Sequence, residues 1–167
     1  MATGRTSPIY AKFQIEDAGG AMRDVAVSSF GDVGLTYDEL DLSAFQDIVK
    51  NYVAGLANFS LSMSGPFSNI AAATASASGE ASGDHLSGSH TVLEPLNGGA
   101  TAKSFGVYFG VQAVWATNDP VFGGIDSIIV TDYKVNIDSG MCSWKIVKSS
   151  NAANDPDWGT AAIAASS

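Results

Sequence analysis

Two histidines are the residues of this chain best suited to metal binding or proton transfer. His85 and His90 lie in the segment ASASGEASGDHLSGSH, and Asp84 directly precedes the first of them. Their spacing matches no standard zinc pattern, and the partners of a serine–histidine–aspartate triad meet only in space. Solvated loop residues are the favoured interpretation, so we expect neither a metal site nor a catalytic set.

Other polar groupings also have simpler explanations than chemistry. Asp38, Glu39 and Asp41 lack the ligand order of a calcium loop and are typical of a solvated acidic turn. The GDVG segment at 31–34 lacks the lysine and hydroxyl residue of a phosphate loop. The glycosylation-like NFS at 58–60 falls in an expected strand, and the first residues lack the apolar core of a secretory signal. The sequence therefore predicts a protein that is not an enzyme and needs no cofactor.

The aromatic residues and the cysteine favour packing over reactivity. Phe105, Phe109 and Trp115 recur at strand spacing, which is more typical of a core than of a ligand-stacking stripe. Trp158 stands in a polar tail and is expected to dock, on this chain or on a neighbour. Cys142 is the single cysteine, so no disulfide forms within the chain, and a small buried residue in a strand is expected.

Charge excludes one class of partner and favours another. Only 15% of the 167 residues are charged, against about 25% on average, which favours a surface that meets other protein. The formal net charge is −9, and eight acids fall between Glu16 and Asp47 with Arg23 as the only basic residue among them. Such a chain repels nucleic acid. No apolar run approaches the roughly 18 residues of a membrane span.

Alternating apolar residues predict a mainly β domain over residues 9–148, between a flexible arm at 1–8 and a tail at 149–167 that is loose unless docked. Glycine-containing turns are expected at 17–20, 97–99 and 138–140, and a loop at 118–124. A long Ala/Ser/Gly loop covers 66–90, and a brief helix could occupy 68–75. The predicted strands are 9–16, 22–28, 35–37, 59–64, 91–96, 105–115, 129–137 and 141–147.

A single short helix is predicted at 44–54. Ser43 and Gln46 form a capping box, in which each side chain satisfies a free backbone N–H at the start of a helix. Gly55 can end the helix. The residues that share one helical face are Phe45, Val49, Tyr52, Val53 and Leu56. We therefore expect an antiparallel β-sandwich or barrel of about seven or eight strands, with this helix packed on it as a rigid brace and subunit contact.

The stretch from Asp24 to Gly65 resembles the major tail tube proteins of long-tailed, siphovirus-like bacteriophages. The shared features are the acid-hydrophobe-Ser-x-Phe segment at 41–45, the helix, the Gly-Leu pair at 55–56, the Ser-rich strand at 58–65, the FGVYFG run at 105–110 and the strand at 128–135. The resemblance covers about two thirds of the chain. It leaves out the loop at 66–90 and the tail.

The resemblance implies a β-sandwich that assembles into hexameric rings, stacked as a tube in the virion tail after assembly in the host cytoplasm. The implied partners are copies of the chain, other tail proteins and double-stranded DNA, which passes down an acidic bore during ejection without tight binding. The candidate bore-lining acids are Asp24, Asp32, Asp126 and Asp132. The candidate contacts between rings are Asp84, His85 and Trp158.

Three other interpretations remain open from the sequence. The chain could be a decoration or tail-terminator subunit of a virion. It could be a carbohydrate-binding β-sandwich, although that function needs exposed aromatic residues around a groove. A hydrolase on a β-sandwich is the weakest of the three.

Overall fold

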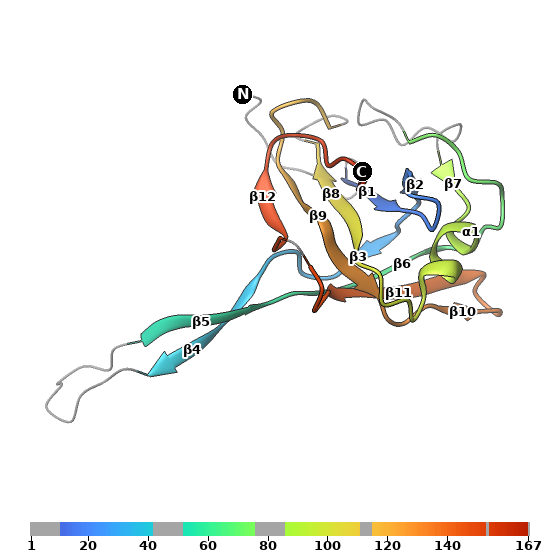
Figure 1. The fold of residues 1–167 in the computed structure, drawn as a ribbon. Helices are drawn as coiled ribbons and strands as arrows, with labels where there is room; N and C mark the ends of the chain where they lie inside the picture. The colour runs from blue at the N-terminus through green and yellow to red at the C-terminus, as the bar shows by residue number, and fades with distance from the viewer. Residues whose placement is uncertain (1–10, 42–51, 76–85, 111–114, 153, 167) are drawn as a thin grey trace, which may run out of the picture.

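A layered body of β-strands and one long projecting hairpin make up the fold (Figure 1). The computed structural model describes residues 11–41, 52–75, 86–110, 115–152 and 154–166. The described residues are mainly β with one short α-helix, as the alternation of the sequence predicts. Within them, β2 with β7 is the only pair of strands that runs parallel.

The first layer is centred on strand β1 (Ala11–Glu16). It pairs on one side with β2 (Met22–Val25) and on the other with β8 (Lys103–Phe109). Beyond β8 lies β9 (Val121–Val130), followed by the short β12 (Asp157–Gly159). The two-residue β7 (Leu86–Ser87) pairs with β2 at the opposite edge.

The second layer is built on β11 (Met141–Lys148), which pairs with β6 (Ser60–Pro66). The short strands β3 (Ser29–Phe30) and β10 (Lys134–Asn136) flank this pair.

Strand β9 belongs to both layers. Its first half pairs with β8, and Ile128–Val130 pair with β11. Between the halves, Asp126 takes the left-handed φ of 47°, and the β8–β9 register shifts between Lys103 and Phe105. This local irregularity lets one strand bend from one layer into the other.

The core lies between the layers and confirms much of the alternation. Phe13 and Ile15 of β1, Leu61 and Met63 of β6, and Trp144 of β11 are all at most 3% exposed. The predicted turn at 17–20 joins β1 to β2, and the turn at 138–140 leads into β11. The period-two pattern therefore located these strands correctly.

The predicted helix at 44–54 is wrong at its C-terminal end. Residues 52–54 and Gly55 belong to strand β5 (Tyr52–Asn58), which pairs with β4 (Thr36–Asp41) from Thr36↔Asn58 to Asp41↔Tyr52. The backbone of this segment is satisfied by its partner strand, which overrides the helical spacing of its apolar residues. Ser43, Phe45, Gln46 and Val49 lie outside the described residues.

The short helix of the described residues lies elsewhere. Helix α1 (Ser89–Leu93) and the 3₁₀ turn η2 (Glu94–Leu96) occupy the segment predicted as a strand at 91–96, so that prediction is wrong. The helical turn buries Val92, Leu93 and Leu96 together against the core, which a strand with alternating sides could not do. The predicted loop at 66–90 contains β7 and the start of α1, and 68–75 is irregular rather than helical.

The glycines at 123 and 124 mark close packing instead of the predicted loop. Both lie within β9, and a Cβ on Gly123 would come within 2.2 Å of the Phe105 carbonyl oxygen. Glycine is required where two backbones approach this closely. The strand predicted at 129–137 is divided between two strands. Residues 129 and 130 form the end of β9, and Lys134–Asn136 form β10.

Strand β8 is covered on both faces. Phe105 and Val107 enter the main core, as predicted. Trp115 does not join them: it packs with Tyr108 and Val121 in a second cluster, with the Tyr108 and Trp115 rings 5.0 Å apart and nearly perpendicular. The Trp115 ring N–H donates to the Asp119 carbonyl oxygen at 3.0 Å, so a turn places this ring on the other side of the sheet.

Candidate functional site

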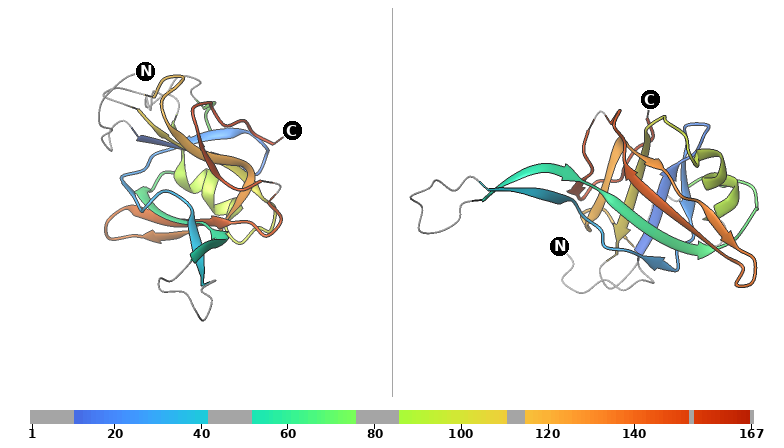
Figure 2. Two further views of the ribbon diagram at one scale, coloured as in Figure 1. Left: turned by 90° about the vertical axis from the view of Figure 1, so that its left-hand side faces the viewer. Right: turned by 90° about the horizontal axis from the view of Figure 1, so that it is seen from below.

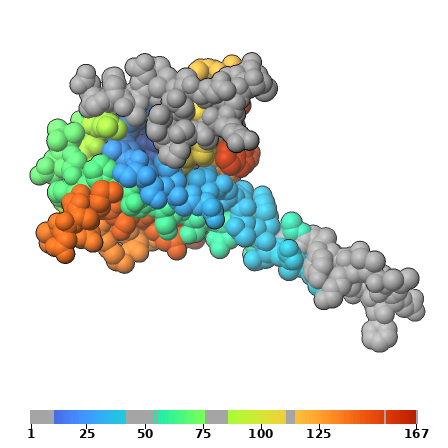
Figure 3. Space-filling view, turned by 180° about the vertical axis from the view of Figure 1, so that it is seen from behind, coloured from blue at the N-terminus to red at the C-terminus, as the bar shows by residue number. Residues whose placement is uncertain are grey.

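The most distinctive feature is the ribbon formed by β4 and β5, here called the hairpin arm. It extends far from the body in Figure 1 and in the right-hand view of Figure 2, and it stands out from the surface in Figure 3. All six residues of β4 are exposed, and a β-bulge interrupts the pairing between Tyr37 and Glu39. A two-stranded ribbon with no third strand is marginally stable in water and leaves two open edges.

The arm presents apolar and acidic side chains to solvent. Tyr37 is 50% exposed, Leu40 is 52% exposed and Leu56 is 82% exposed. Its charges are Asp38, Glu39 and Asp41, and its described residues include no basic side chain. Exposed apolar residues on an acidic ribbon are typical of an interaction surface.

The base of the arm is fixed to the centre of the body by Phe59. This residue follows β5 directly, is 1% exposed, and packs its ring 5.3 Å from that of Phe105 and 5.4 Å from that of Phe122. Ahead of β4, directly after β3, the Gly31 N–H donates to the Ser62 carbonyl oxygen at 2.8 Å. A Cβ on Gly31 would lie 3.0 Å from that oxygen, so a glycine fits this close approach.

Further apolar residues are exposed at the opposite end of the body. Strand β10 and the turn that follows it lie at the end away from the arm (Figures 1 and 2). Val135 is 40% exposed and Ile137 is 90% exposed. Phe67, 40% exposed, donates its backbone N–H to the Gly140 carbonyl oxygen at 2.9 Å, which joins the end of β6 to this turn.

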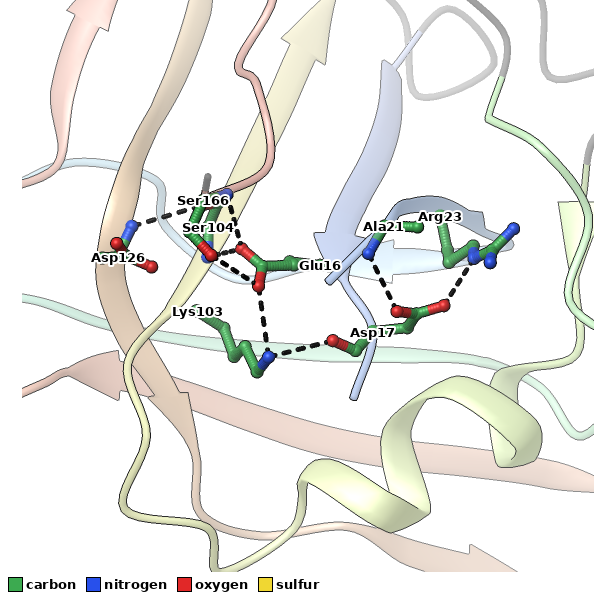
Figure 4. Close-up of polar contacts among 8 residues, drawn as sticks. All are labelled: Glu16, Asp17, Ala21, Arg23, Lys103, Ser104, Asp126 and Ser166. Atoms are coloured by element: carbon green, nitrogen blue, oxygen red, sulfur yellow. Dashed lines mark hydrogen bonds and ion pairs between the residues drawn. The ribbon is translucent and has the colours of Figure 1, made fainter. Parts of the chain in front are cut away.

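A buried carboxylate joins three distant segments (Figure 4). The side chain of Glu16 is 2% exposed and accepts hydrogen bonds from Lys103 Nζ at 3.1 Å, the Ser104 N–H at 3.3 Å, and the Ser166 N–H and hydroxyl at 3.0 and 2.9 Å. Burial alone would raise the pKa of Glu16, but the bonds from Ser166, Ser104 and Lys103 lower it below its usual value. The ionised carboxylate therefore holds the C-terminal residues on the body.

The adjacent Asp17 orders the β1–β2 turn (Figure 4). It accepts from the Ala21 N–H at 2.9 Å and from Arg23 Nε at 2.6 Å. Burial opposes ionisation here too, yet these bonds lower the pKa of Asp17. Arg23 also donates to the Ala73 carbonyl oxygen at 2.8 Å, which ties the turn to the segment after β6.

The tail predicted to be loose unless docked is docked on the body. Strand β12 pairs with β9, and the Ile163 N–H donates to the Tyr108 hydroxyl oxygen at 2.9 Å. Burial is the main cause that raises the pKa of Tyr108 to about 12. Trp158 packs its ring 5.5 Å from Phe109 and 5.1 Å from Phe122 and remains 52% exposed, so it docks on its own chain and still offers half of its surface.

The four candidate bore acids lie on four different segments. Asp24 is 1% exposed in β2, with Lys12 Nζ 4.0 Å away, so it is not a surface acid and leaves the set of candidates. Burial lowers the pKa of Lys12, and Asp24 partly opposes that shift. Asp32 is exposed after β3, Asp126 is half-buried at the bend of β9, and Asp132 pairs with Lys134 at 2.9 Å.

The remaining candidate residues separate into three groups. Asp84 and His85 lie outside the described residues, whereas Tyr52 and Leu56 belong to β5. His90 lies in α1, with Nδ1 3.2 Å from the Tyr133 hydroxyl oxygen.

Across the described ranges, no three His, Cys, Asp or Glu side chains are grouped so as to hold a metal ion. None of the helices in those ranges has the length and apolar character needed to cross a membrane.

Sequence reasoning missed the hairpin arm and the Glu16 cluster. The arm carried a visible signal, since Tyr52, Val53 and Leu56 suit a strand as well as a helix face. The cluster carried none, because Glu16, Lys103 and Ser166 are far apart in the sequence.

The chain matches no protein-family model and no curated protein sequence significantly. The structure defines a β-sandwich-like protein with a projecting hairpin arm, and the interpretation of its function depends on that geometry.

Proposed function

We propose that this chain is a structural subunit, not an enzyme, that assembles with copies of itself into a phage tail tube of stacked hexameric rings. The observation that carries the proposal is the hairpin arm, which projects from the body with apolar side chains 50 to 82% exposed. A second copy of the chain is the partner that covers it.

Exposed apolar residues at both ends of the subunit support this assembly. The arm presents Leu40 and Leu56 at one end, and Val135 and Ile137 are exposed at the other. Two different surfaces that recognise each other between identical copies generate closed rings or open filaments. Docking also pairs or covers the open edges of the ribbon.

The charge of the chain supports passage of DNA without tight binding. The formal net charge is −9, and Asp32 and Asp132 remain among the exposed candidate bore acids. Duplex DNA carries one negative charge per roughly 1.7 Å of its axis, so an acidic bore repels it and keeps sliding free. The tube therefore acts as a conduit in the virion tail.

Electron microscopy of the concentrated protein tests the proposal. We expect tubes or rings of wild type, and we expect Leu56→Ser and Leu40→Ser to stay monomeric by light scattering. Both side chains are more than half exposed, so each variant should keep its free energy of unfolding within about 0.5 kcal/mol. Ile125→Ser, at a 43% exposed position in the middle of β9, is the matched control and should assemble.

A wild type that stays monomeric at high concentration overturns the proposal, as do arm variants that assemble as efficiently as wild type. Assembled protein should leave duplex DNA unbound even at about 50 mM salt, where electrostatic binding is strong. Retention of DNA under those conditions contradicts the acidic conduit.

A further inference from the structure

The C-terminal segment 157–166, here called the C-terminal strap, begins as β12 beside β9, then passes over β8 and ends near β1 (Figure 1). Four attachments hold it, one of them a hydrogen bond of 3.3 Å from the Asn118 N–H to the Thr160 carbonyl oxygen. Strand β12 pairs with residues 121–123 of β9, the Ile163 N–H donates to Tyr108, and Ser166 donates two hydrogen bonds to Glu16 (Figure 4).

The surface beneath the strap needs a cover. Tyr108 and Val121, which pack with Ile163 of the strap, are at most 1% exposed, and the side chain of Glu16 is 2% exposed. If these groups were uncovered, large apolar side chains would face water and the carboxylate would lose two of its donors. The body therefore presents a groove that is built for a short extended segment with this sequence.

The strap itself is held only lightly. Most of its residues are exposed, its strand pairing covers three residues, and Trp158 keeps half of its surface in solvent. The segment before it runs along the surface from the end of β11, where Lys148 pairs with Asp155 at 2.6 Å. A terminal segment with few contacts and a surface connection can leave its groove without unfolding the body.

We infer that the groove on β9 and β8 also takes the C-terminal strap of a second copy, so that copies are linked by exchange of this strap. The occupant follows from the structure, because the groove already holds this sequence, and an identical strap offers the same backbone pairing, Trp158 ring and Ser166 donors. Exchange between identical chains keeps every contact and is a low-cost route to association. The inference stands independently of the proposed tube.

Cysteine trapping with the full-length chain tests the exchange. Val121 of β9 and Gly159 of the strap are register partners, so V121C and G159C place one thiol on each side of the groove. Cys142 is kept because it is 1% exposed, and wild type is oxidised alongside. The double variant V121C/G159C should close an internal disulfide, which shows that the pair has suitable geometry.

The deciding sample is an equal mixture of the two single variants. Neither can close an internal bond at the groove, so a V121C–G159C heterodimer exceeds the level of random collision only when a strap docks on another chain. The collision baseline is V121C mixed with S139C, since Ser139 is exposed in the turn after β10. We expect the heterodimer about ten-fold above that baseline, because docking holds the thiols at an effective concentration in the millimolar range.

A heterodimer yield equal to the baseline overturns the inference. If the double variant does not close, a photo-crosslinking residue at Ile163 in an equal mixture of isotope-labelled and unlabelled chains decides instead. Crosslinks between the two isotopes support exchange, and crosslinks within one isotope alone contradict it. Microscopy of the same samples separates the two proposals, since tubes without exchange overturn only the strap inference, and exchange without tubes overturns only the tube.

Discussion

Glu16 and Ser166, 150 residues apart in the sequence, are joined by two hydrogen bonds of 3.0 and 2.9 Å. The first residue ends the strand at the centre of one layer, and the second lies near the C-terminus. Their contact fastens the C-terminal segment to the end of β1, and Lys103 Nζ binds the same carboxylate.

Glu16→Gln should destabilise the protein. The substitution keeps the size of the side chain but removes the charge that Lys103 and Ser166 bind, so the free energy of unfolding should fall by about 1 to 3 kcal/mol. Urea denaturation measures it. The control is Asp132→Asn, whose exposed ion pair with Lys134 should be worth less than about 1 kcal/mol. Equal stabilities of the two variants would show that the Glu16 contacts contribute little.

Acid should weaken the fold through Glu16 and Asp17. The pKa of each carboxyl is lower in the folded protein than its ordinary value, which is 4.5 for Glu16 and 3.8 for Asp17. The unfolded chain therefore binds these protons first, and stability present at neutral pH is lost as the pH falls below about 5. Unfolding curves measured from neutral to acidic pH should show this loss, and Glu16→Gln should make it smaller. A pH dependence that the substitution leaves unchanged would be inconsistent with the network.

Gly123→Ala should disrupt the centre of the first layer. The added Cβ would meet the Phe105 carbonyl oxygen at 2.2 Å, so the β8–β9 pair must separate at this point. Gly159→Ala is a close control, because its Cβ would meet only a Val121 methyl group at 4.0 Å on the strand beside it. Thermal unfolding should show a large loss for the first variant and less than about 0.5 kcal/mol for the second. Similar melting temperatures of the two variants would mean that β8 and β9 can move apart at Gly123 without loss of stability.

Phe59→Ala should cost more than any change on the arm itself. It removes a ring that packs on both Phe105 and Phe122 in the core, so about 3 to 5 kcal/mol of stability should be lost. Phe67→Ala makes the same change at a 40% exposed position and should cost much less. Denaturant unfolding followed by circular dichroism compares them. Comparable losses would show that Phe59 is not an anchor.

The sequence predicted the strands whose two faces differ. Phe13 with Ile15, and Leu61 with Met63, alternate with more polar neighbours, so period two was informative there. It failed for Val92 and Leu93, two adjacent apolar residues that a helical turn buries on one side. It failed again at Gly123, where a residue typical of loops permits a close approach of two strands.

The candidate site was harder to predict because its contacts are non-local. The pairing of Tyr52 with Asp41 joins residues on either side of a segment that reads well as a helix, and only the partner strand decides between the two forms. The docking of the tail depends on Glu16 and Tyr108, which lie in distant parts of the chain. Local sequence patterns contain no information about contacts between residues that are distant in the sequence.

The position of Phe59 has a mechanical consequence. Because Phe59 directly follows strand β5, a force that pulls on β5 reaches the aromatic centre of the domain within a single residue. In the proposed assembly, tension on the arm would be resisted by the packed rings of Phe59, Phe105 and Phe122. The ribbon is therefore suited to bear load, because no loop separates it from the core.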